Sequence, residues 1–600
     1  MEIKRIFDLV DNYEEKFNKD DVFAAKITGS WKKYSVKDYR DYSDNISYSL
    51  IAMGIKKGDK IITVTNNRPE WNFCDIGIMQ VGAIHVPIYP TISDEEYTHI
   101  LNNAEAKIVF VSSKLLYNRI KPIADTITSI TDVFAFDEFE ESRNWKEFLD
   151  LAKNNKDKYK EELLKIKDSI DQDDVCTLIY TSGTTGLSKG VMLSHKNFLS
   201  NVDGVLPRIP INETDRALSF LPLCHVYERM VGYTYQTKGL SIYYAENMGT
   251  IANDLKTVKA SLFTTVPRLL ETVYDKIITK GKDLEGFKKA IFNWSLKLAS
   301  NYDIENQNFI SKIKMSIADK LVFSKWREAL GGNIKLIVSG GASLQPKLAT
   351  SFYAAKIMVA EGYGLTETSP VIAFNDIMTK DGFMIGSVGP IIHNTEVKIA
   401  DDGEILVKGP GIMKGYYNNE KETKAVIKDD WFHTGDVGEI VNGKFLKITD
   451  RKKEIFKNSA GKYIAPQVIE NKFKESFLVQ QIMVVGDGEK FASALISPNF
   501  NYLHYWATKH KIHFRDNKEL IQNEDVLKKV QDEITRQNKE LAAHEQLKRF
   551  RLVCDEWTTQ SGELSPTLKK KRRILYKKYD HILRDIYQYA EGEEDRAIKK

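Results

Sequence analysis

The segment from Leu178 to His195 reads L-I-Y-T-S-G-T-T-G-L-S-K-G-V-M-L-S-H, and its residue types predict a phosphate-binding loop that follows a strand. After Tyr180, six of the next seven residues are Thr, Ser or Gly. Small residues let the backbone approach an anion closely, and hydroxyl and free N–H groups donate to phosphate oxygens. Lys189 adds a positive charge, and Ser194 is a suitable N-cap for a following helix.

This loop differs from the Walker loop of switch-type NTPases, because Gly190 follows Lys189 and the Gly-Lys-Ser/Thr ending is absent. A generic Ser/Gly stretch would be a surface turn. The long run of hydroxyls with a downstream lysine favours a phosphate site instead. The residues expected to contact phosphate are Thr181, Ser182, Gly183, Thr184, Thr185, Gly186 and Lys189.

Outward from the loop, β-rich runs alternate with amphipathic stretches, which predicts parallel sheets wrapped by helices. The predicted strands are 60–67, 106–113, 176–182, 217–222, 240–245 and 334–341.

The pattern of residue types changes twice after these strands. After about residue 390, closely spaced strands with Gly- and Asp-bearing turns predict a β-rich lobe, and from about residue 450 a charged, mixed segment with a long amphipathic helix near 522–543 indicates a small α+β domain. The expected fold class is α/β, with a large N-terminal domain at 1–449 and a small, mobile C-terminal domain at 450–600.

Composition predicts a large soluble protein. The 600 residues exceed the roughly 250–300 that one hydrophobic core serves, and no segment approaches the ~20 apolar residues of a membrane-spanning helix. The net charge of +4 is spread along the chain, which disfavours a nucleic-acid surface. Charges throughout the N-terminal segment argue against secretion, so a cytoplasmic location is expected. Four widely separated cysteines indicate neither disulfides nor zinc.

Five further strings carry the resemblance to a known family. They are LPLCHVYERM (221–230), VSGGASL (338–344), EGYGLTET (361–368), WFHTGDVG (431–438) and ITDRKKEIFKNSAGKYIAPQVIE (448–470). With the phosphate loop, and in this order, they make nearly the whole chain resemble the adenylate-forming superfamily. The H-V-Y-E-R form and a long helical insertion between about 281 and 330 resemble its AMP-forming long-chain fatty-acid–CoA ligases.

The resemblance implies a large domain for ATP and the acyl substrate, over which the small domain swings. It also implies a reaction in two steps: a long-chain fatty acid is joined to the α-phosphate of ATP with release of pyrophosphate, and the acyl group then passes to the thiol of coenzyme A. The first step brings two anions together and requires cations and fixed donors. The expected cofactors are therefore ATP, Mg²⁺ and coenzyme A as co-substrate.

Residue roles follow from the same resemblance. Glu367 matches the metal-binding and catalytic glutamate, and Thr181 is a second metal ligand. Tyr363 is expected to stack on the purine, Asp436 to accept hydrogen bonds from the ribose hydroxyls, and Arg451 to contact the sugar or the phosphate. The remaining residues expected along the nucleotide are Gly340, Gly341, Ala342, Gly364 and Thr366.

The two other catalytic residues leave alternatives open. His225 would gate the acyl pocket, whereas a packed structural histidine is the alternative. The family's lysine usually lies in P-K-T-x-x-G-K, but this chain reads G-E-L-S-P-T-L-K-K-K-R-R at 562–573. Aligning the basic ends gives Lys569 the role of bridging the carboxylate and the α-phosphate, with Lys570 and Lys571 as alternatives and a basic tail or anionic-lipid patch as the competing interpretation.

The same model makes Asp450 the hinge, with the loop around Gly461 lining the coenzyme A channel after rotation. Tyr233 and Tyr235 are candidates for the mouth of an acyl tunnel, with ordinary packing as the alternative.

Two other functions stay open: an adenylating enzyme that transfers to a carrier-protein thiol, and a non-catalytic acyl- or nucleotide-binding protein. Long-chain acids partition into bilayers, so peripheral contact with the inner membrane is compatible with the sequence, although no amphipathic anchor stands out. Chain-length preference and oligomeric state are not readable from the motifs.

Overall fold

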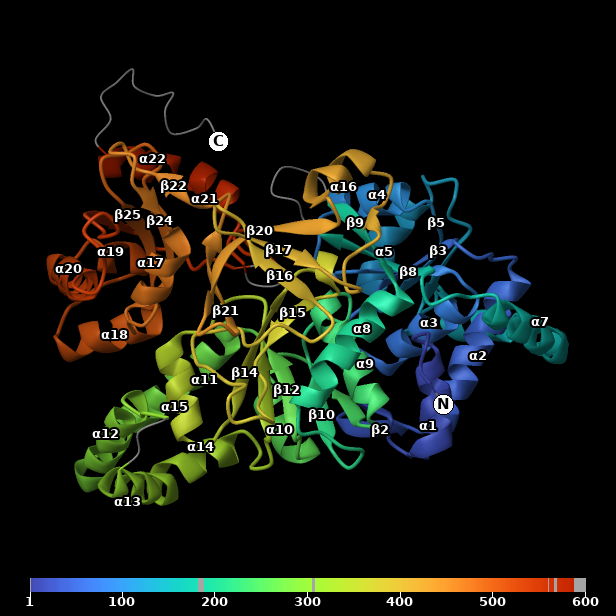
Figure 1. The fold of residues 1–600 in the computed structure, drawn as a ribbon, viewed down its shortest axis with the longest axis horizontal. Helices are drawn as coiled ribbons and strands as arrows, with labels where there is room; N and C mark the ends of the chain where they lie inside the picture. The colour runs from blue at the N-terminus through green and yellow to red at the C-terminus, as the bar shows by residue number, and fades with distance from the viewer. Residues whose placement is uncertain (1, 182–187, 305–307, 559, 566–568, 588–600) are drawn as a thin grey trace.

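Two large sheets with helices between and around them form the body of the protein (Figure 1). The computed structural model describes residues 2–181, 188–304, 308–558, 560–565 and 569–587. Sheet A runs in the order β15 (Val371–Phe374), β14 (Val359–Gly364), β13 (Leu336–Ser339), β12 (Leu262–Thr265), β10 (Arg216–Ser219), β11 (Ser241–Tyr244), β1 (Phe23–Ile27) and β2 (Ser30–Tyr34). Sheet B runs in the order β18 (Gly415–Tyr416), β9 (Lys189–Ser194), β8 (Val175–Thr181), β4 (Ile84–Ile88), β3 (Lys60–Val64), β5 (Ala106–Val111), β6 (Asp132–Ala135) and β7 (Arg143–Asn144).

All six predicted strands are confirmed, and most pairs are parallel as expected. Four strands depart from the parallel pattern, since β2, β15, β9 and β18 pair antiparallel. The connections explain part of this difference: β1 to β2 and β8 to β9 are joined by short segments, and parallel pairing requires a long crossover.

One core lies between the two sheets and is shared by them. It contains residues of β1, β11 and β12 from sheet A together with residues of β3, β5 and β8 from sheet B. Helix α3 (Pro69–Gln80) is buried at every residue, and α9 (Val226–Thr237) is buried along most of its length. Helix α8 (His195–Val205) begins as predicted, with the Ser194 side chain accepting from the N–H of Asn197. Helices α3 and α9 can be buried on nearly all sides because they pack within this shared core.

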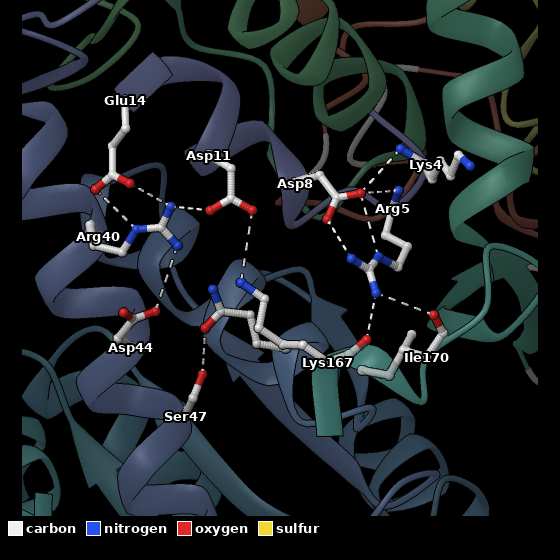
Figure 2. A network of polar contacts seen from close by, with 11 residues as sticks. Lys4, Arg5, Asp8, Asp11, Glu14, Arg40, Asp44, Ser47, Lys167 and Ile170 are labelled. Carbon is white, nitrogen blue, oxygen red and sulfur yellow. Dashed lines mark hydrogen bonds and ion pairs between the residues drawn. The ribbon is translucent and has the colours of Figure 1, made fainter. Parts of the chain in front are cut away.

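Polar contacts hold the N-terminal helix α1 (Asp8–Lys16) against α2 (Val36–Ala52) and α7 (Lys156–Asp168), as Figure 2 shows. Arg40 on α2 donates to Glu14 at 2.8 Å. Lys167 on α7 lies 3.9 Å from a carboxylate oxygen of Asp11. The start of the chain is therefore part of the large domain.

The predicted β-rich lobe is present as a five-stranded antiparallel sheet. Its strands are β16 (Glu396–Ile399), β17 (Glu404–Lys408), β20 (Trp431–Val441), β19 (Ile427–Lys428) and β21 (Phe445–Arg451). The predicted helical insertion joins β12 to β13 and comprises α11 (Pro267–Lys282), α12 (Gly286–Ser300), α13 (Phe309–Ala318) and α14 (Ser324–Ala329). The other helices of the large domain are α4 (Asp94–Asn103), α5 (Lys114–Ala124), α6 (Trp145–Asp150), α10 (Ile251–Val258), α15 (Pro346–Ala354) and α16 (Glu420–Val426).

The C-terminal part is an α+β unit with cores of its own, drawn in orange and red in Figure 1. Its strands are β22 (Phe456–Lys457), β23 (Tyr463–Ile464), β24 (Val479–Val485), β25 (Ser493–Pro498) and β26 (Arg549–Leu552). Its helices are α17 (Pro466–Phe473), α18 (Phe500–Lys509), α19 (Asn517–Leu520), α20 (Glu524–Asn538), α21 (Arg572–Lys578) and α22 (Asp580–Tyr587). Within the described ranges, no helix has both the length and the apolar character that crossing a bilayer requires.

Candidate active site

A cavity of about 3130 Å³ lies where the strand ends of sheet A, the β-rich lobe and the small domain meet. Most of the expected site residues line it: Thr181, Lys189, His225, Gly340, Gly341, Ala342, Tyr363, Gly364, Thr366, Glu367, Asp436, Arg451 and Lys569. Ser182, Gly183, Thr184, Thr185 and Gly186 lie outside the described residues. Segments more than 300 residues apart in sequence therefore converge on one space.

Strands β13 and β14 explain why two of the motifs meet. Gly340 directly follows β13, and Tyr363 lies near the end of β14, so both are at the carboxyl edge of parallel strands, where ligands of α/β sheets bind. A Cβ on Gly340 would lie 3.1 Å from the ring of Tyr227, whose hydroxyl donates to the carbonyl of Val338 at 3.0 Å. Glycine at this position leaves room for Tyr227, a cavity residue that the sequence reasoning missed.

Tyr363, Asp436 and Arg451 form one hydrogen-bonded group. The Tyr363 hydroxyl donates to Asp436 Oδ2 at 2.7 Å, and Arg451 Nε lies 3.4 Å from Asp436 Oδ1. Asp436 and Arg451 are register partners on β20 and β21. Burial raises the pKa of Asp436, and the guanidinium of Arg451 opposes that rise. Because a carboxylate offers about four acceptor positions, Asp436 can still accept from a ligand.

Glu367 is held from two sides. Tyr416 on β18 donates to its Oε1 at 2.8 Å, and the N–H of Met413 donates to its backbone carbonyl at 2.9 Å. Lys189 forms an ion pair with Glu422, and its ammonium lies 5.1 Å from the ring centroid of Tyr416. Sheet B thereby supports the carboxylate that faces the cavity.

The donor set fits magnesium only in combination with a phosphate. Over the described part of the chain, no group of three or more His, Cys, Asp or Glu side chains is placed to hold a metal ion. Mg²⁺ in phosphate-transfer sites is usually bound by one or two carboxylates, phosphate oxygens and water. Glu367 and the hydroxyl of Thr181, both lining the cavity, are compatible with that arrangement.

The neighbouring lysines 569 and 570 lie in different surroundings. Lys569 lines the cavity. Burial by the surrounding protein and then the positive charge of Arg451 lower the pKa of Lys569 to about 8, whereas the carboxylates of Asp436 and Glu367 oppose this shift. Lys570 Nζ bonds to the buried carboxylate of Glu470 and donates to the carbonyl of Ile482 at 2.7 Å. Both lysines line the cavity, but Lys569 interacts electrostatically with Asp436 and Glu367, whereas the ammonium of Lys570 is paired with Glu470.

His225 occupies the N-cap of α9, where its Nδ1 accepts from the N–H of Tyr227 at 3.2 Å. Burial, followed by the charge of Lys569, lowers the pKa of His225 to about 4. Its imidazole is therefore neutral near pH 7. It caps a helix and also lines the cavity, and its role as a gate stays a prediction.

An apolar arm of the cavity runs back along sheet A. It is lined by Val231 and Tyr235 of α9 and by Leu262, Leu336 and Val338 of β12 and β13. Leu336 begins β13 and Gly340 follows its end. At about 3.3 Å per residue, these four steps span roughly 13 Å. The apolar lining and this length suit an extended hydrocarbon chain.

Arg229 of the 221–230 motif connects α9 to sheet B and to a buried polar network. Arg229 donates to Thr177 on β8 at 2.6 Å and pairs with the buried Asp75. Asp75 also bonds to His85 at 2.6 Å and accepts from Tyr233 at 2.5 Å. Tyr233 therefore faces this buried network, whereas Tyr235 lines the apolar arm.

The sequence reasoning also missed two buried glutamates. Glu228 accepts from Ser219 on β10 at 2.6 Å and from Thr264 on β12. Glu361 accepts from the N–H of Leu344 at 3.1 Å. Burial raises the pKa of each carboxyl to about 7. Their hydrogen bonds hold α9 and the 338–344 loop against sheet A.

Asp450 connects β21 to the first long helix of the small domain. Its Oδ1 accepts from the N–H of Arg451 at 2.6 Å, and its Oδ2 accepts from the N–H of Gln467 in α17 at 3.0 Å. Gly461 lies in an exposed turn between β22 and β23, with φ of 74°, and is not among the residues that line the cavity. Its place in a coenzyme A channel stays a prediction.

Comparisons with known proteins cover almost the whole chain. A model described as AMP-binding enzyme matches residues 13–417, and one described as AMP-binding enzyme C-terminal domain matches 454–591. Long-chain-fatty-acid–CoA ligase FadD15 of Mycobacterium tuberculosis is 30% identical over 577 residues, which cover 94% of each chain. Long chain acyl-CoA synthetase 4 of Arabidopsis thaliana is 32% identical over 600 residues, covering 94% of this chain and 88% of that one.

Solved structures share the fold at lower identity. The adenylation domain of a carboxylate reductase from Mycobacterium chelonae superposes with a TM-score of 0.73 at 20% identity, covering 98% of this chain and 91% of that one. A fatty acyl CoA synthetase of Mycobacterium tuberculosis gives 0.58 at 18% identity, covering 97% and 99%.

Proposed function

Because this chain belongs to the AMP-binding enzyme family, in the branch of the long-chain fatty-acid–CoA ligases, we propose that it converts a long-chain fatty acid to its coenzyme A thioester. In the first step the carboxylate attacks the α-phosphate of ATP and pyrophosphate leaves. In the second step the thiol of coenzyme A attacks the acyl carbon of the acyl-AMP, and AMP leaves.

The observation that carries this proposal is the convergence of Lys569, Glu367 and Asp436 on one cavity that continues into an apolar arm. A nucleotide and a hydrocarbon chain can therefore enter the same space. The site supplies charge where the two anionic substrates meet, which is what the first step needs most.

Each polar residue has a distinct task in the first step. Asp436 accepts from the ribose hydroxyls, and the ring of Tyr363 stacks on the purine. Lys569, when protonated, bridges the attacking carboxylate and the α-phosphate. Glu367 and Thr181 would hold Mg²⁺, which supplies charge neutralisation on phosphate oxygens when it is bound.

His225 acts as a neutral gate in this scheme. Its low pKa prevents it from adding a second cation beside Lys569. Its place at the start of α9, which also supplies Val231 and Tyr235 to the apolar arm, suits a side chain that admits the acyl chain and excludes water.

The second step requires a different position of the small domain, which we propose begins at residue 450. Rotation about Asp450 withdraws Lys569 and brings the loop around Gly461 to the cavity, where it lines the coenzyme A channel. A cytoplasmic location is also part of the proposal.

A carrier-protein thiol is the acceptor that competes with coenzyme A, because the first step would be the same. Equal concentrations of coenzyme A and a phosphopantetheinylated carrier protein, offered to the purified enzyme with a radiolabelled long-chain acid, distinguish them. The proposal expects label in coenzyme A, and label mainly in the carrier protein would contradict it.

The test of the whole proposal is the nucleotide product. Purified protein with ATP and Mg²⁺ should give AMP and pyrophosphate with a long-chain acid, and AMP formation should continue to turn over only when coenzyme A is added. Formation of ADP and orthophosphate, or no ATP cleavage with any carboxylic acid of a panel, would overturn it.

A further inference from the structure

The helical insertion between β12 and β13 carries an exposed apolar surface that the reaction does not use. It lies at one corner of the large domain, in green at the lower left of Figure 1. On α13 and the turn of π-helix that follows, Phe309 is 77% exposed, Ile310 62%, Ile313 47%, Ile317 47% and Leu321 44%. Clusters of this kind mark a surface that binds something.

The four apolar residues of α13 itself share one stripe. A helix turns by about 100° per residue, so relative to Phe309 the side chain of Ile313 lies at about 40°, Ile317 at about 80° and Ile310 at about 100°. Ala318 lies at about 180° and is buried. The stripe therefore faces away from the body of the protein.

Lysines flank the stripe on both sides. Measured around the helix axis from Phe309, Lys314 lies at about +140° and Lys312 at about −60°. Both lysines are exposed. Between residues 309 and 325, four lysines accompany one acidic residue, a net charge of +3. That acidic residue, Asp319, is already paired with Arg327 and Lys356. An apolar stripe with lysines along its edges is the pattern of helices that lie in a membrane interface.

We propose that α13 is an interfacial helix that docks the protein on an anionic lipid bilayer. The apolar stripe enters the boundary between headgroups and acyl chains, while the stems of Lys312 and Lys314 lie along it and their ammonium groups reach the headgroups. A second copy of this chain fits this surface less well, because the lysines beside its stripe would repel the lysines beside this one.

The position of the insertion connects this surface with the acyl site. It joins the two strands that supply Leu262 and Leu336 to the apolar arm. That docking through α13 helps the enzyme to collect a fatty acid dissolved in the membrane rests on the proposed function. Binding to lipid itself does not, since it needs no catalysis.

Vesicle flotation of the full chain tests the proposal. We expect the protein to float with phosphatidylcholine vesicles that contain phosphatidylglycerol, at least tenfold more than with phosphatidylcholine alone. The double variant I313E/I317E should lose at least tenfold of this binding. The double variant K312Q/K314Q should bind anionic vesicles more weakly, by roughly fivefold for each lysine removed, and its binding to phosphatidylcholine alone should not change.

A matched control is Leu115→Glu, because Leu115 on α5 is 74% exposed outside this surface. It should float like the parent chain. The proposal is overturned if the parent does not float with anionic vesicles, if I313E/I317E floats equally well, or if that variant only dissolves a dimer seen by size-exclusion chromatography.

The two proposals fail separately. Without vesicles, I313E/I317E should form AMP from ATP, coenzyme A and octanoate, a water-soluble acid, at the parent rate, which also shows that it is folded. Absence of AMP formation by the parent chain would contradict the proposed function and leave the flotation result standing.

Discussion

The hydroxyl of Tyr363 donates to Asp436 Oδ2 at 2.7 Å, and so joins the end of a strand of sheet A to the β-rich lobe. The two residues are expected to contact different parts of the nucleotide, the purine and the ribose. The hydrogen bond fixes the carboxylate before a ligand arrives. Such preorganisation reduces the cost of ordering the site on binding.

Tyr363→Phe should separate the hydrogen bond from the ring. The variant keeps a stacking surface but frees Asp436, and a hydrogen bond to a charged group contributes roughly 1.5–3 kcal/mol. We expect the KM for ATP to rise about tenfold with little change in kcat, measured as pyrophosphate release. Tyr363→Ala should raise it further. Equal effects of the two variants would mean that the ring makes no contribution.

Lys569→Ala should abolish acyl-AMP formation. The variant removes the cation that faces Asp436 and Glu367, so pyrophosphate release should fall by at least about 10²-fold, the size of effect seen when one preorganised charge-stabilising donor is removed. Supplied acyl-AMP should still react with coenzyme A. The control is Lys528→Ala, an exposed lysine on α20 of the same domain. Unchanged pyrophosphate release would show that Lys569 has no role in this step.

The lowered pKa of Lys569 predicts the alkaline limit of the first step. The side chain acts as a cation, and its pKa of about 8 in the free protein lies below the ordinary lysine value of 10.5. As pH rises through about 8 the amine loses its proton, so kcat/KM for pyrophosphate release should fall. Lys569→Arg keeps its charge to higher pH and should move that limit upward. An unchanged alkaline limit in Lys569→Arg would assign it to another group.

Lys282 on α11 should contribute to docking of the small domain. Its ammonium lies 4.4 Å from the ring centroid of Tyr502 and 5.6 Å from those of Phe477 and Tyr505. Exposed cation–π contacts contribute roughly 0.5–1 kcal/mol each. Lys282→Ala should slow pyrophosphate release about fivefold and leave the reaction of supplied acyl-AMP unchanged. Lys280→Ala, in the same turn but exposed, is the control, and an equal loss in both would show a general charge effect.

Asp450→Pro should slow the thioester step at least tenfold. Proline fixes φ near −65° and so restricts the backbone at the expected hinge. Asp450→Asn preserves backbone freedom and an acceptor for the N–H of Gln467, and should retain most activity. The rate of acyl-CoA formation from supplied acyl-AMP checks both. A parental rate in Asp450→Pro would place the hinge elsewhere.

Much of the fold could be predicted from the sequence, because the spacing of apolar residues and the residue types at turns and helix caps are local features. The strands around β3, β5, β8, β10, β11 and β13 stand out as apolar runs, and the cap at Ser194 follows from its own residue type. The antiparallel pairing of β18 with β9 could not be predicted, because the two strands are more than 200 residues apart in the chain.

The site shows the same division. Residues in recognisable strings, such as Glu367 and Asp436, line the cavity as expected. The supporting contacts of Tyr416 with Glu367 and of Glu361 with Leu344 were missed, since a lone tyrosine or glutamate carries no signal in sequence. The surface on α13 was missed for a similar reason: an apolar stripe reads as a core face until the fold shows that nothing covers it.

The pairing of Lys570 with Glu470 gives the neighbouring lysines 569 and 570 different roles. Successive side chains in extended backbone point to opposite sides, and Lys570 forms a β-bridge with Leu564. The ammonium of Lys570 is thus committed to Glu470, a buried carboxylate of the small domain that Arg572 also contacts at 2.6 Å. Two adjacent residues of the same type therefore serve different parts of the molecule, one the reaction space and the other the cohesion of the small domain, so an equal charge does not make them interchangeable.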